Sequence, residues 1–131
     1  MQESLLELVR RTSTEIPDDV HRAIMASLEE EKKNTIAESA MKIIEQNIKL
    51  AEKKSQPICQ DTGTVIFYVS CPRGFDQLAF EEAARWAVKT ATAKGYLRQN
   101  SVDSLTGRND GTNLGAGAPV FHFHQHADAR V

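Results

Sequence analysis

The chain has 131 residues, of which 40% are hydrophobic and 26% charged, with a formal net charge of −2. This composition is typical of one modest globular domain and excludes an intrinsically disordered chain. The 16 basic residues balance 18 acidic ones without a basic cluster, which argues against a nucleic-acid-binding surface. No apolar run approaches the roughly 20 residues that cross a bilayer, and residues 1–10 lack a secretion signal, so we expect a cytoplasmic protein.

Two helices are predicted in the first 33 residues. Residues 5–9 supply the short apolar stripe of the first helix. Pro17 suits the first turn of the second helix, because its fixed φ is helical and no amide donor is needed there. In this second helix apolar residues recur every four positions and predict one buried face: Val20, Ile24 and Leu28.

A third helix is predicted to begin at Asn34 or Thr35, since either side chain can cap it by accepting from the freed amides. Its apolar stripe runs at helical spacing through residues 36–51. The helix must end by Gln56, because Pro57 disfavours the helical conformation of the residue before it. These first 56 residues therefore form a helical region whose pattern specifies no function.

The pattern changes to mixed α/β from Pro57 onwards. A polar loop, residues 57–63, precedes residues 65–69, which are almost all apolar and predict a strand covered on both faces. Asp76 can cap the following helix, which ends at Gly95. A strand followed by a helix in this order indicates an α/β arrangement.

A long loop and a second strand complete the pattern. Residues 97–117 are rich in glycine and asparagine, and a loop of that length inside a compact domain indicates a function. Residues 119–125 then predict a strand. We expect a mixed α/β fold in which a helical N-terminal layer packs on a small mixed sheet that is incomplete at the C-terminus. The 57–63 and 97–117 loops are expected to converge at one end.

Two places in the loops could carry chemistry. Cys59, Gln60 and Asp61 place a thiol, an amide and a carboxylate side by side just ahead of a strand. The thiol could be a nucleophile, a metal or cluster ligand, or a small buried residue. Arg98 opens the long loop, where its guanidinium could clamp a carboxylate or form a surface ion pair. Cys71, which closes the apolar strand, is expected to be buried without a chemical role.

The last strand carries three histidines that point to one face, because they alternate along the strand: His122, His124 and His126. Two neighbouring members could chelate zinc if a third ligand were present. The three together span more than about 10 Å, which is too far for a single ion. The residues therefore leave two interpretations open. The strand is either a non-catalytic metal- or partner-binding module or a polar or interface-facing stripe.

Taken together, the two loops and the last strand resemble one known family. Residues 57–63, Pro-Ile-Cys-Gln-Asp-Thr-Gly, resemble the cluster-binding loop of the iron–sulfur-dependent (class I) fumarate hydratases, a family that includes L-tartrate dehydratase. Residues 97–103, Leu-Arg-Gln-Asn-Ser-Val-Asp, resemble its substrate loop, and residues 109–113 and 119–122 continue the likeness in order. The helical first part of the chain is compatible with the family.

The resemblance implies a 4Fe-4S cluster held by three cysteine thiolates, with one iron left open as a Lewis acid for a small dicarboxylate substrate. Cys59 matches the first of these cysteines, whereas Cys71 matches neither of the others. Arg98 matches a residue that binds a substrate carboxylate. Gln60 and Asp61 match residues that position the hydroxyl and the bound water, and Asp61 is the expected catalytic residue. The base comes from elsewhere in the enzyme.

The reaction implied is the reversible hydration of fumarate to L-malate, with the alpha subunit of L-tartrate dehydratase as the alternative. The family pattern continues beyond residue 131 into a glycine-rich substrate-binding segment. Residues 1–131 are therefore expected to be the N-terminal part of the catalytic domain, with a helical region, 1–56, and a cluster- and substrate-loop region, 57–131. A beta subunit or C-terminal domain would complete a homo- or hetero-oligomer, and this part alone should be inactive.

Overall fold

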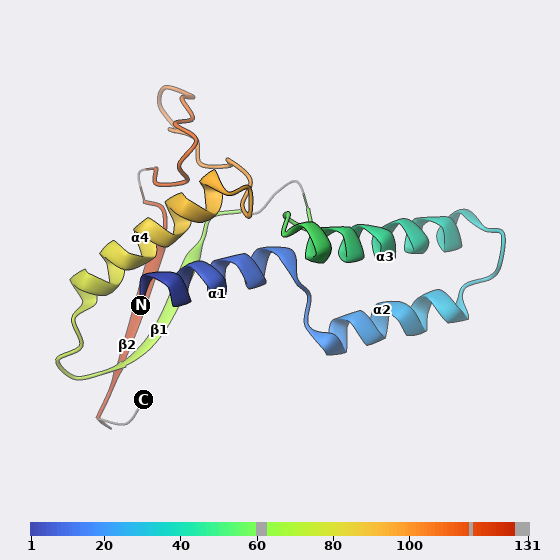
Figure 1. The fold of residues 1–131 in the computed structure, drawn as a ribbon, viewed down its shortest axis with the longest axis horizontal. Helices are drawn as coiled ribbons and strands as arrows, with labels where there is room; N and C mark the ends of the chain where they lie inside the picture. The colour runs from blue at the N-terminus through green and yellow to red at the C-terminus, as the bar shows by residue number, and fades with distance from the viewer. Residues whose placement is uncertain (60–62, 116, 128–131) are drawn as a thin grey trace.

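The computed structural model describes residues 1–59, 63–115 and 117–127, which form four helices and two strands (Figure 1). In chain order these are α1 (Gln2–Thr14), α2 (Asp18–Glu30), α3 (Ile36–Lys54), β1 (Ile66–Pro72), α4 (Gln77–Ala93) and β2 (Val120–His126). The predicted α/β class is confirmed. The predicted long loop is also confirmed, because its described residues, 97–115 and 117, contain no helix or strand.

The strands β1 and β2 form a parallel pair, with α4 as the crossover between them. Ile66 lies opposite Val120 in the register, and the N–H of Val120 donates to the carbonyl oxygen of Val65 at 2.9 Å. Because the strands are parallel, both begin at the same end of the sheet. The chain segments that lead into the two strands therefore meet at that end (Figure 1).

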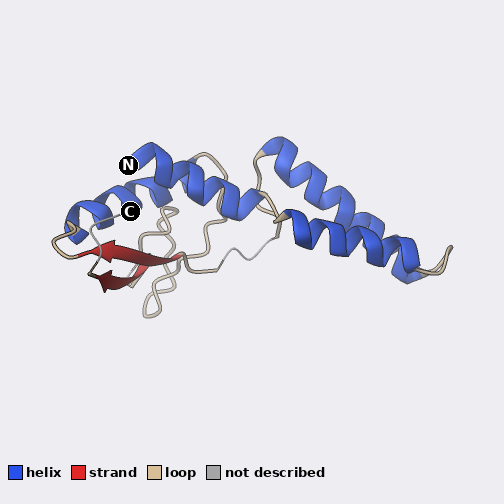
Figure 2. Ribbon diagram, turned by 90° about the horizontal axis from the view of Figure 1, so that it is seen from below, coloured by secondary structure: helices blue, strands red, loops and turns tan. Residues whose placement is uncertain are grey.

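One face of the sheet is covered by α4 and α1 (Figure 2). Phe67 of β1 is buried on this face, where its ring stacks on that of Phe121 with centroids 5.4 Å apart. Small side chains on α4 permit the close approach of its neighbours. The buried residues that the two helices contribute to this core are Leu5, Leu6, Val9, Ala83, Ala84, Ala87, Val88 and Ala91.

The opposite face of the sheet is open, so the expectation of a strand covered on both faces was wrong. Tyr68 is 79% exposed and Ile66 is 47% exposed, whereas Phe67 and Cys71 are buried. Successive side chains of a strand point to opposite faces, and the described residues cover only one of them. The apolar run of β1 is therefore divided between core and surface.

The helices α2 and α3 form a hairpin that projects away from the α/β part, so α1 alone of the three predicted N-terminal helices packs over the sheet, beside α4 (Figures 1 and 2). Thr35 caps α3 by accepting from the N–H of Glu38 at 3.1 Å. The predicted buried face of α2 is only partly covered, since Val20 is 43% exposed. α3 has 19 residues, but neither it nor any other described helix is apolar enough to cross a membrane.

Candidate active site

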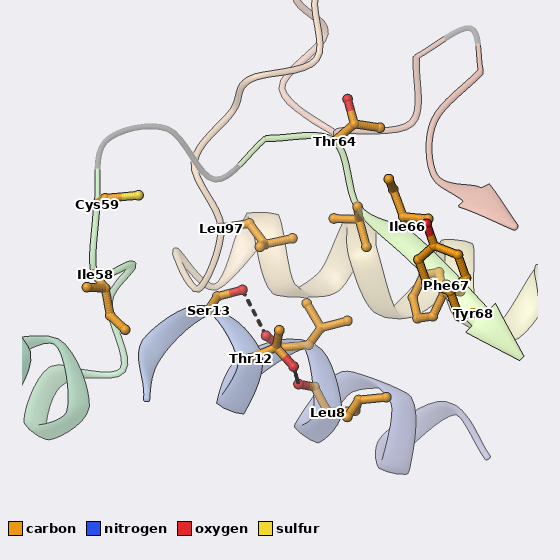
Figure 3. A pocket seen from close by; sticks show the side chains of 12 residues that line it. Leu8, Thr12, Ser13, Ile58, Cys59, Thr64, Ile66, Phe67, Tyr68 and Leu97 are labelled. Carbon is orange, nitrogen blue, oxygen red and sulfur yellow. Dashed lines mark hydrogen bonds between the residues drawn. The ribbon is translucent and has the colours of Figure 1, made fainter. Parts of the chain in front are cut away.

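A cavity of about 650 Å³ opens between α1 and the start of β1 (Figure 3). One wall is the face of α1 around Leu8 and Thr12, and another is the segment through Ile58 and Cys59. Leu97, which opens the long loop, completes the lining. The cavity therefore brings the beginnings of the two predicted functional loops together, although about forty positions separate them in the chain.

Cys59 is exposed, and Figure 3 shows its sulfur directed toward the cavity. The preceding residue, Ile58, is held from two sides. Its N–H donates to the carbonyl oxygen of Ser13 at 3.1 Å, and its carbonyl oxygen accepts from Nδ2 of Asn47 at 2.6 Å. Because Ser13 belongs to α1 and Asn47 to α3, the two helices together set the backbone from which Cys59 projects.

The turn that leads from α3 into this segment is fastened to α1 by Arg10. Ser55 ends α3 with a left-handed backbone, φ 49°, and its Oγ accepts from Nη1 of Arg10 at 3.5 Å. The same guanidinium donates to Glu7 at 2.7 Å and to Glu15 at 2.7 Å. The hydrogen bond from Arg10 is the largest cause that lowers the pKa of Glu7 to about 2.

Two of the four predicted site residues lie within the described structure. Arg98 directly follows Leu97, which is 5% exposed and lines the cavity, whereas Arg98 itself is exposed. Cys59 therefore lines the cavity. Arg98 does not line it but is the next residue after Leu97, which does. Gln60 and Asp61, the predicted substrate-binding and catalytic residues, lie outside the described residues.

Asn113 fastens the segment that begins with Arg98, and the sequence pattern did not reveal this role. Its Nδ2 donates to the carbonyl oxygen of Arg98 at 2.6 Å, while its Oδ1 accepts from the N–H groups of Asn100 and Ser101. Asn113 is 8% exposed and has a left-handed backbone, φ 57°. A glycine-rich loop indicates turns, but the burial of one of its asparagines follows only from tertiary contacts.

Cys71 and the histidines of β2 do not line the cavity. Cys71 is 1% exposed, which confirms its predicted burial. His122 lies on the open face of the sheet, where its ring stacks on that of Tyr68 with centroids 5.0 Å apart. Over residues 1–59, 63–115 and 117–127, no group of three or more His, Cys, Asp or Glu side chains is arranged to hold a metal ion.

The chemistry of the cavity suits one corner of a larger metal centre. An exposed thiol is a soft ligand that iron and iron–sulfur clusters prefer, and Cys59 presents one at the cavity. A single thiolate cannot hold a cluster, and buried Cys71 is not available to help. The residues at the cavity therefore fit one cluster ligand, and further ligands would have to come from outside the described residues.

Comparison with known proteins points to one family. The profile described as fumarate hydratase (Fumerase) matches residues 2–131. A Geobacillus stearothermophilus protein named as a class I fumarate hydratase is 45% identical over 125 residues, which make up 95% of this chain and 24% of that protein.

Two relatives carry the name of the alpha subunit of L(+)-tartrate dehydratase. The Escherichia coli K12 subunit is 32% identical over 108 residues, which make up 82% of this chain and 35% of the subunit. A Methanocaldococcus jannaschii protein named as this subunit is 31% identical over 122 residues, which make up 91% of this chain and 42% of that protein.

The chain spans between 24% and 42% of the length of these relatives. The match begins at residue 2, so the likeness seen in the loop motifs extends through the N-terminal helices as well. The profile covers almost every residue, including both walls of the cavity. The chain belongs to the fumarate hydratase (Fumerase) family.

Proposed function

We propose that residues 1–131 are the N-terminal part of the catalytic domain of a 4Fe-4S hydro-lyase, which hydrates fumarate reversibly to L-malate. Residues 1–56 form its helical region, and residues 57–131 carry its cluster and substrate loops. The observation that carries the proposal is the cavity between α1 and β1. In this chain of the fumarate hydratase family, the cavity is lined both by Cys59, whose thiol is exposed, and by Leu97, the residue that precedes Arg98.

We favour fumarate as the substrate because the chain has a higher sequence identity to the relative named for fumarate than to those named for tartrate. The relative named for fumarate hydration is 45% identical, whereas the alpha subunits named for tartrate dehydration are 31% and 32% identical. L-tartrate dehydratase is the second candidate, since its alpha subunit matches 82% of the chain. Assay of fumarate hydration against L-tartrate dehydration by the same preparation separates the two.

Cys59 is assigned as one ligand of the cluster. The cluster, when bound, supplies a Lewis-acidic iron to the reaction. A thiolate ligand must be reachable, and Cys59 is exposed at the cavity whereas Cys71 is 1% exposed in the core. The hydrogen bonds at Ile58 support this assignment, because they fix the backbone from which the thiolate would project.

We assign substrate binding to three residues: Arg98, Gln60 and Asp61. The planar guanidinium of Arg98 matches the two oxygens of a carboxylate, and its backbone is anchored by Asn113. Gln60 and Asp61 together position the hydroxyl and the bound water, and Asp61 is the proposed catalytic residue. In hydration the water oxygen bonds to one alkene carbon and a proton bonds to the other, and dehydration reverses both changes. The base that moves this proton belongs to another part of the enzyme.

A beta subunit or C-terminal domain is assigned to complete the site, within a homo- or hetero-oligomer. Two of the relatives are named as alpha subunits, and the chain spans at most 42% of any of the three. Residues 1–131 alone are expected to be inactive, because the one matched thiolate, that of Cys59, cannot hold the cluster by itself. This chain together with those parts makes up the assembled enzyme.

Anaerobic reconstitution of the assembled enzyme with iron and sulfide tests the proposal. We expect a brown iron–sulfur chromophore together with fumarate hydration, and we expect Cys59→Ser to lose both. Cys71→Ala is the matched control, since it removes the buried thiol and should keep the chromophore. A Cys59→Ser enzyme that retains its iron, sulfide and absorbance would contradict the assignment of Cys59.

A further inference from the structure

We propose that Asn113 is a positioning residue, which fixes the backbone at Arg98 so that this arginine can bind a carboxylate of the substrate. The inference rests on the role proposed above for Arg98. Asn113 lies fifteen positions further along the chain and is 8% exposed. A buried polar side chain in a surface loop needs partners, and those partners show what it does.

The carboxamide of Asn113 uses every hydrogen-bonding position it has. Oδ1 accepts from the N–H of Asn100 at 2.9 Å and from that of Ser101 at 3.0 Å. Nδ2 donates to the carbonyl oxygen of Arg98 at 2.6 Å and to Oγ1 of Thr92 at 3.0 Å. An amide has two acceptor sites and two donors, so the set is complete. The orientation is unambiguous, because backbone N–H groups only donate and a carbonyl oxygen only accepts.

Thr92 connects this set of bonds to the core. It is 4% exposed in the last turn of α4, and its Oγ1 donates to the carbonyl oxygen of Val88 at 2.8 Å. Val88, also on α4, is fully buried in the hydrophobic core. Leu97, on the other side, anchors the start of the loop in the same core. The carboxamide of Asn113 therefore ties the substrate loop to the hydrophobic core.

Asparagine suits this position better than any similar residue. The left-handed backbone at position 113, φ 57°, is tolerated by Asn and Gly but costs energy for most other residues. Aspartate would lose both donors, and glutamine would place its amide one methylene further out. Glycine fits the backbone but makes none of the four bonds, which makes Asn113→Gly the cleanest way to remove them.

The outcome is an arginine with a fixed backbone and an exposed side chain. Within the described residues, the guanidinium of Arg98 has no hydrogen bond or ion pair that would commit it to a structural role. Fixing the backbone in advance reduces the entropy that is lost when a carboxylate binds. Loss of Asn113 should therefore weaken substrate binding more than it slows the chemical step.

Steady-state kinetics of the assembled enzyme test this inference with Arg98→Ala, Asn113→Gly and the double variant. We expect each single variant to raise KM for fumarate about tenfold, the size expected for one lost charged hydrogen bond, with kcat nearly unchanged. The double variant should have the KM of Arg98→Ala alone, because Asn113 acts through Arg98. A merely structural residue would instead multiply the two effects.

The outcomes separate the inference from the proposed function. An unchanged KM in Asn113→Gly, or a double variant whose rise in KM is the product of the single rises, overturns the inference and leaves the proposed function standing. An unchanged KM in Arg98→Ala overturns the substrate role of Arg98, and the inference fails with it.

Thr92→Val keeps the inference testable if Asn113→Gly folds poorly. Valine has nearly the shape of threonine but gives Nδ2 of Asn113 no acceptor. We expect faster hydrogen exchange at the amides of Asn100 and Ser101, unchanged exchange in α1, and a KM between those of the parent and Arg98→Ala. Thr92→Ser is the matched control and should behave as the parent. Parental exchange at both amides in Thr92→Val would overturn the inference.

Discussion

Nδ2 of Asn47 donates a hydrogen bond to the carbonyl oxygen of Ile58, with 2.6 Å between the two atoms. Asn47 belongs to the helical hairpin that projects from the α/β part, whereas Ile58 directly precedes Cys59. This bond gives the hairpin a direct contact with the cavity segment. The backbone of Ile58, next to the proposed cluster ligand, is therefore held by both α1 and α3.

Replacement of Asn47 should loosen the segment that carries Cys59. In Asn47→Ala the carbonyl oxygen of Ile58 loses its partner, which costs about 1 kcal/mol locally. We expect the amide of Ile58 to exchange about fivefold faster, the factor that corresponds to this energy. Hydrogen exchange measured by mass spectrometry on the assembled enzyme checks this result. Gln46→Ala, at the neighbouring exposed position, is the control, and equal exchange in the two variants would contradict the prediction.

The ion pairs of Glu7 should make stability depend on pH in the acid range. Its pKa falls from the ordinary value of 4.5 to about 2, first because of the hydrogen bond from Arg10. A lowered pKa in the folded state stabilises the fold above pH 4.5, and this contribution is lost as the pH falls from 4.5 toward 2. The melting temperatures of the parent and of Glu7→Gln should therefore differ at pH 7 and converge near pH 2. A difference that is constant over this range would contradict the prediction, and Glu3→Gln on the same helix is the control.

The two faces of β1 should respond very differently to truncation. Phe67 is buried and meets the ring of Phe80 edge-on at 6.1 Å, whereas its neighbour Tyr68 is 79% exposed. Phe67→Ala should lower the free energy of unfolding by about 3–5 kcal/mol, because it leaves a cavity in the core. Tyr68→Ala should cost less than about 1 kcal/mol. Denaturant titration measures both values, and similar losses would show that the second face is covered in the assembled enzyme.

Gly115 should tolerate a methyl group only if Ser101 gives way. A Cβ at position 115 would clash with Oγ of Ser101 but would lie 3.7 Å from its Cβ. Gly115→Ala should therefore displace the 97–117 loop, at a cost of about 1 kcal/mol. Removal of the hydroxyl in Ser101→Ala should relieve the clash. Denaturant titration of the two single variants and the double variant gives the coupling, and additive losses would refute the predicted contact.

Local signals predicted the boundaries of the elements well. Thr35 was one of two proposed caps for α3, and Asp76 caps α4 by accepting from the N–H of Ala79 at 3.0 Å. The limit placed on α3 by Pro57 also held, since this helix ends at Lys54. Caps and prolines act through their nearest neighbours in the chain, and the sequence shows those neighbours directly.

Properties that depend on distant residues were not predictable in the same way. The apolar run of β1 suggested burial on both faces, but how many layers cover a sheet depends on the rest of the assembly, and Tyr68 is exposed here. The buried face predicted for α2 is only partly covered for the same reason. The role of Asn113 needed the positions of Thr92 and Arg98, which lie 21 and 15 residues away.

The parallel pairing of β1 and β2 also determines where the molecule can be altered without harm. Both strands start beside the cavity, so the turn at Arg73 and Gly74 that follows β1 lies at the far end of the sheet. Arg73 is exposed and can be replaced, whereas Gly74 has a left-handed backbone, φ 80°, in which a side chain would be strained. A fluorophore or an affinity handle attached at Arg73 would therefore lie a full strand length away from the cavity.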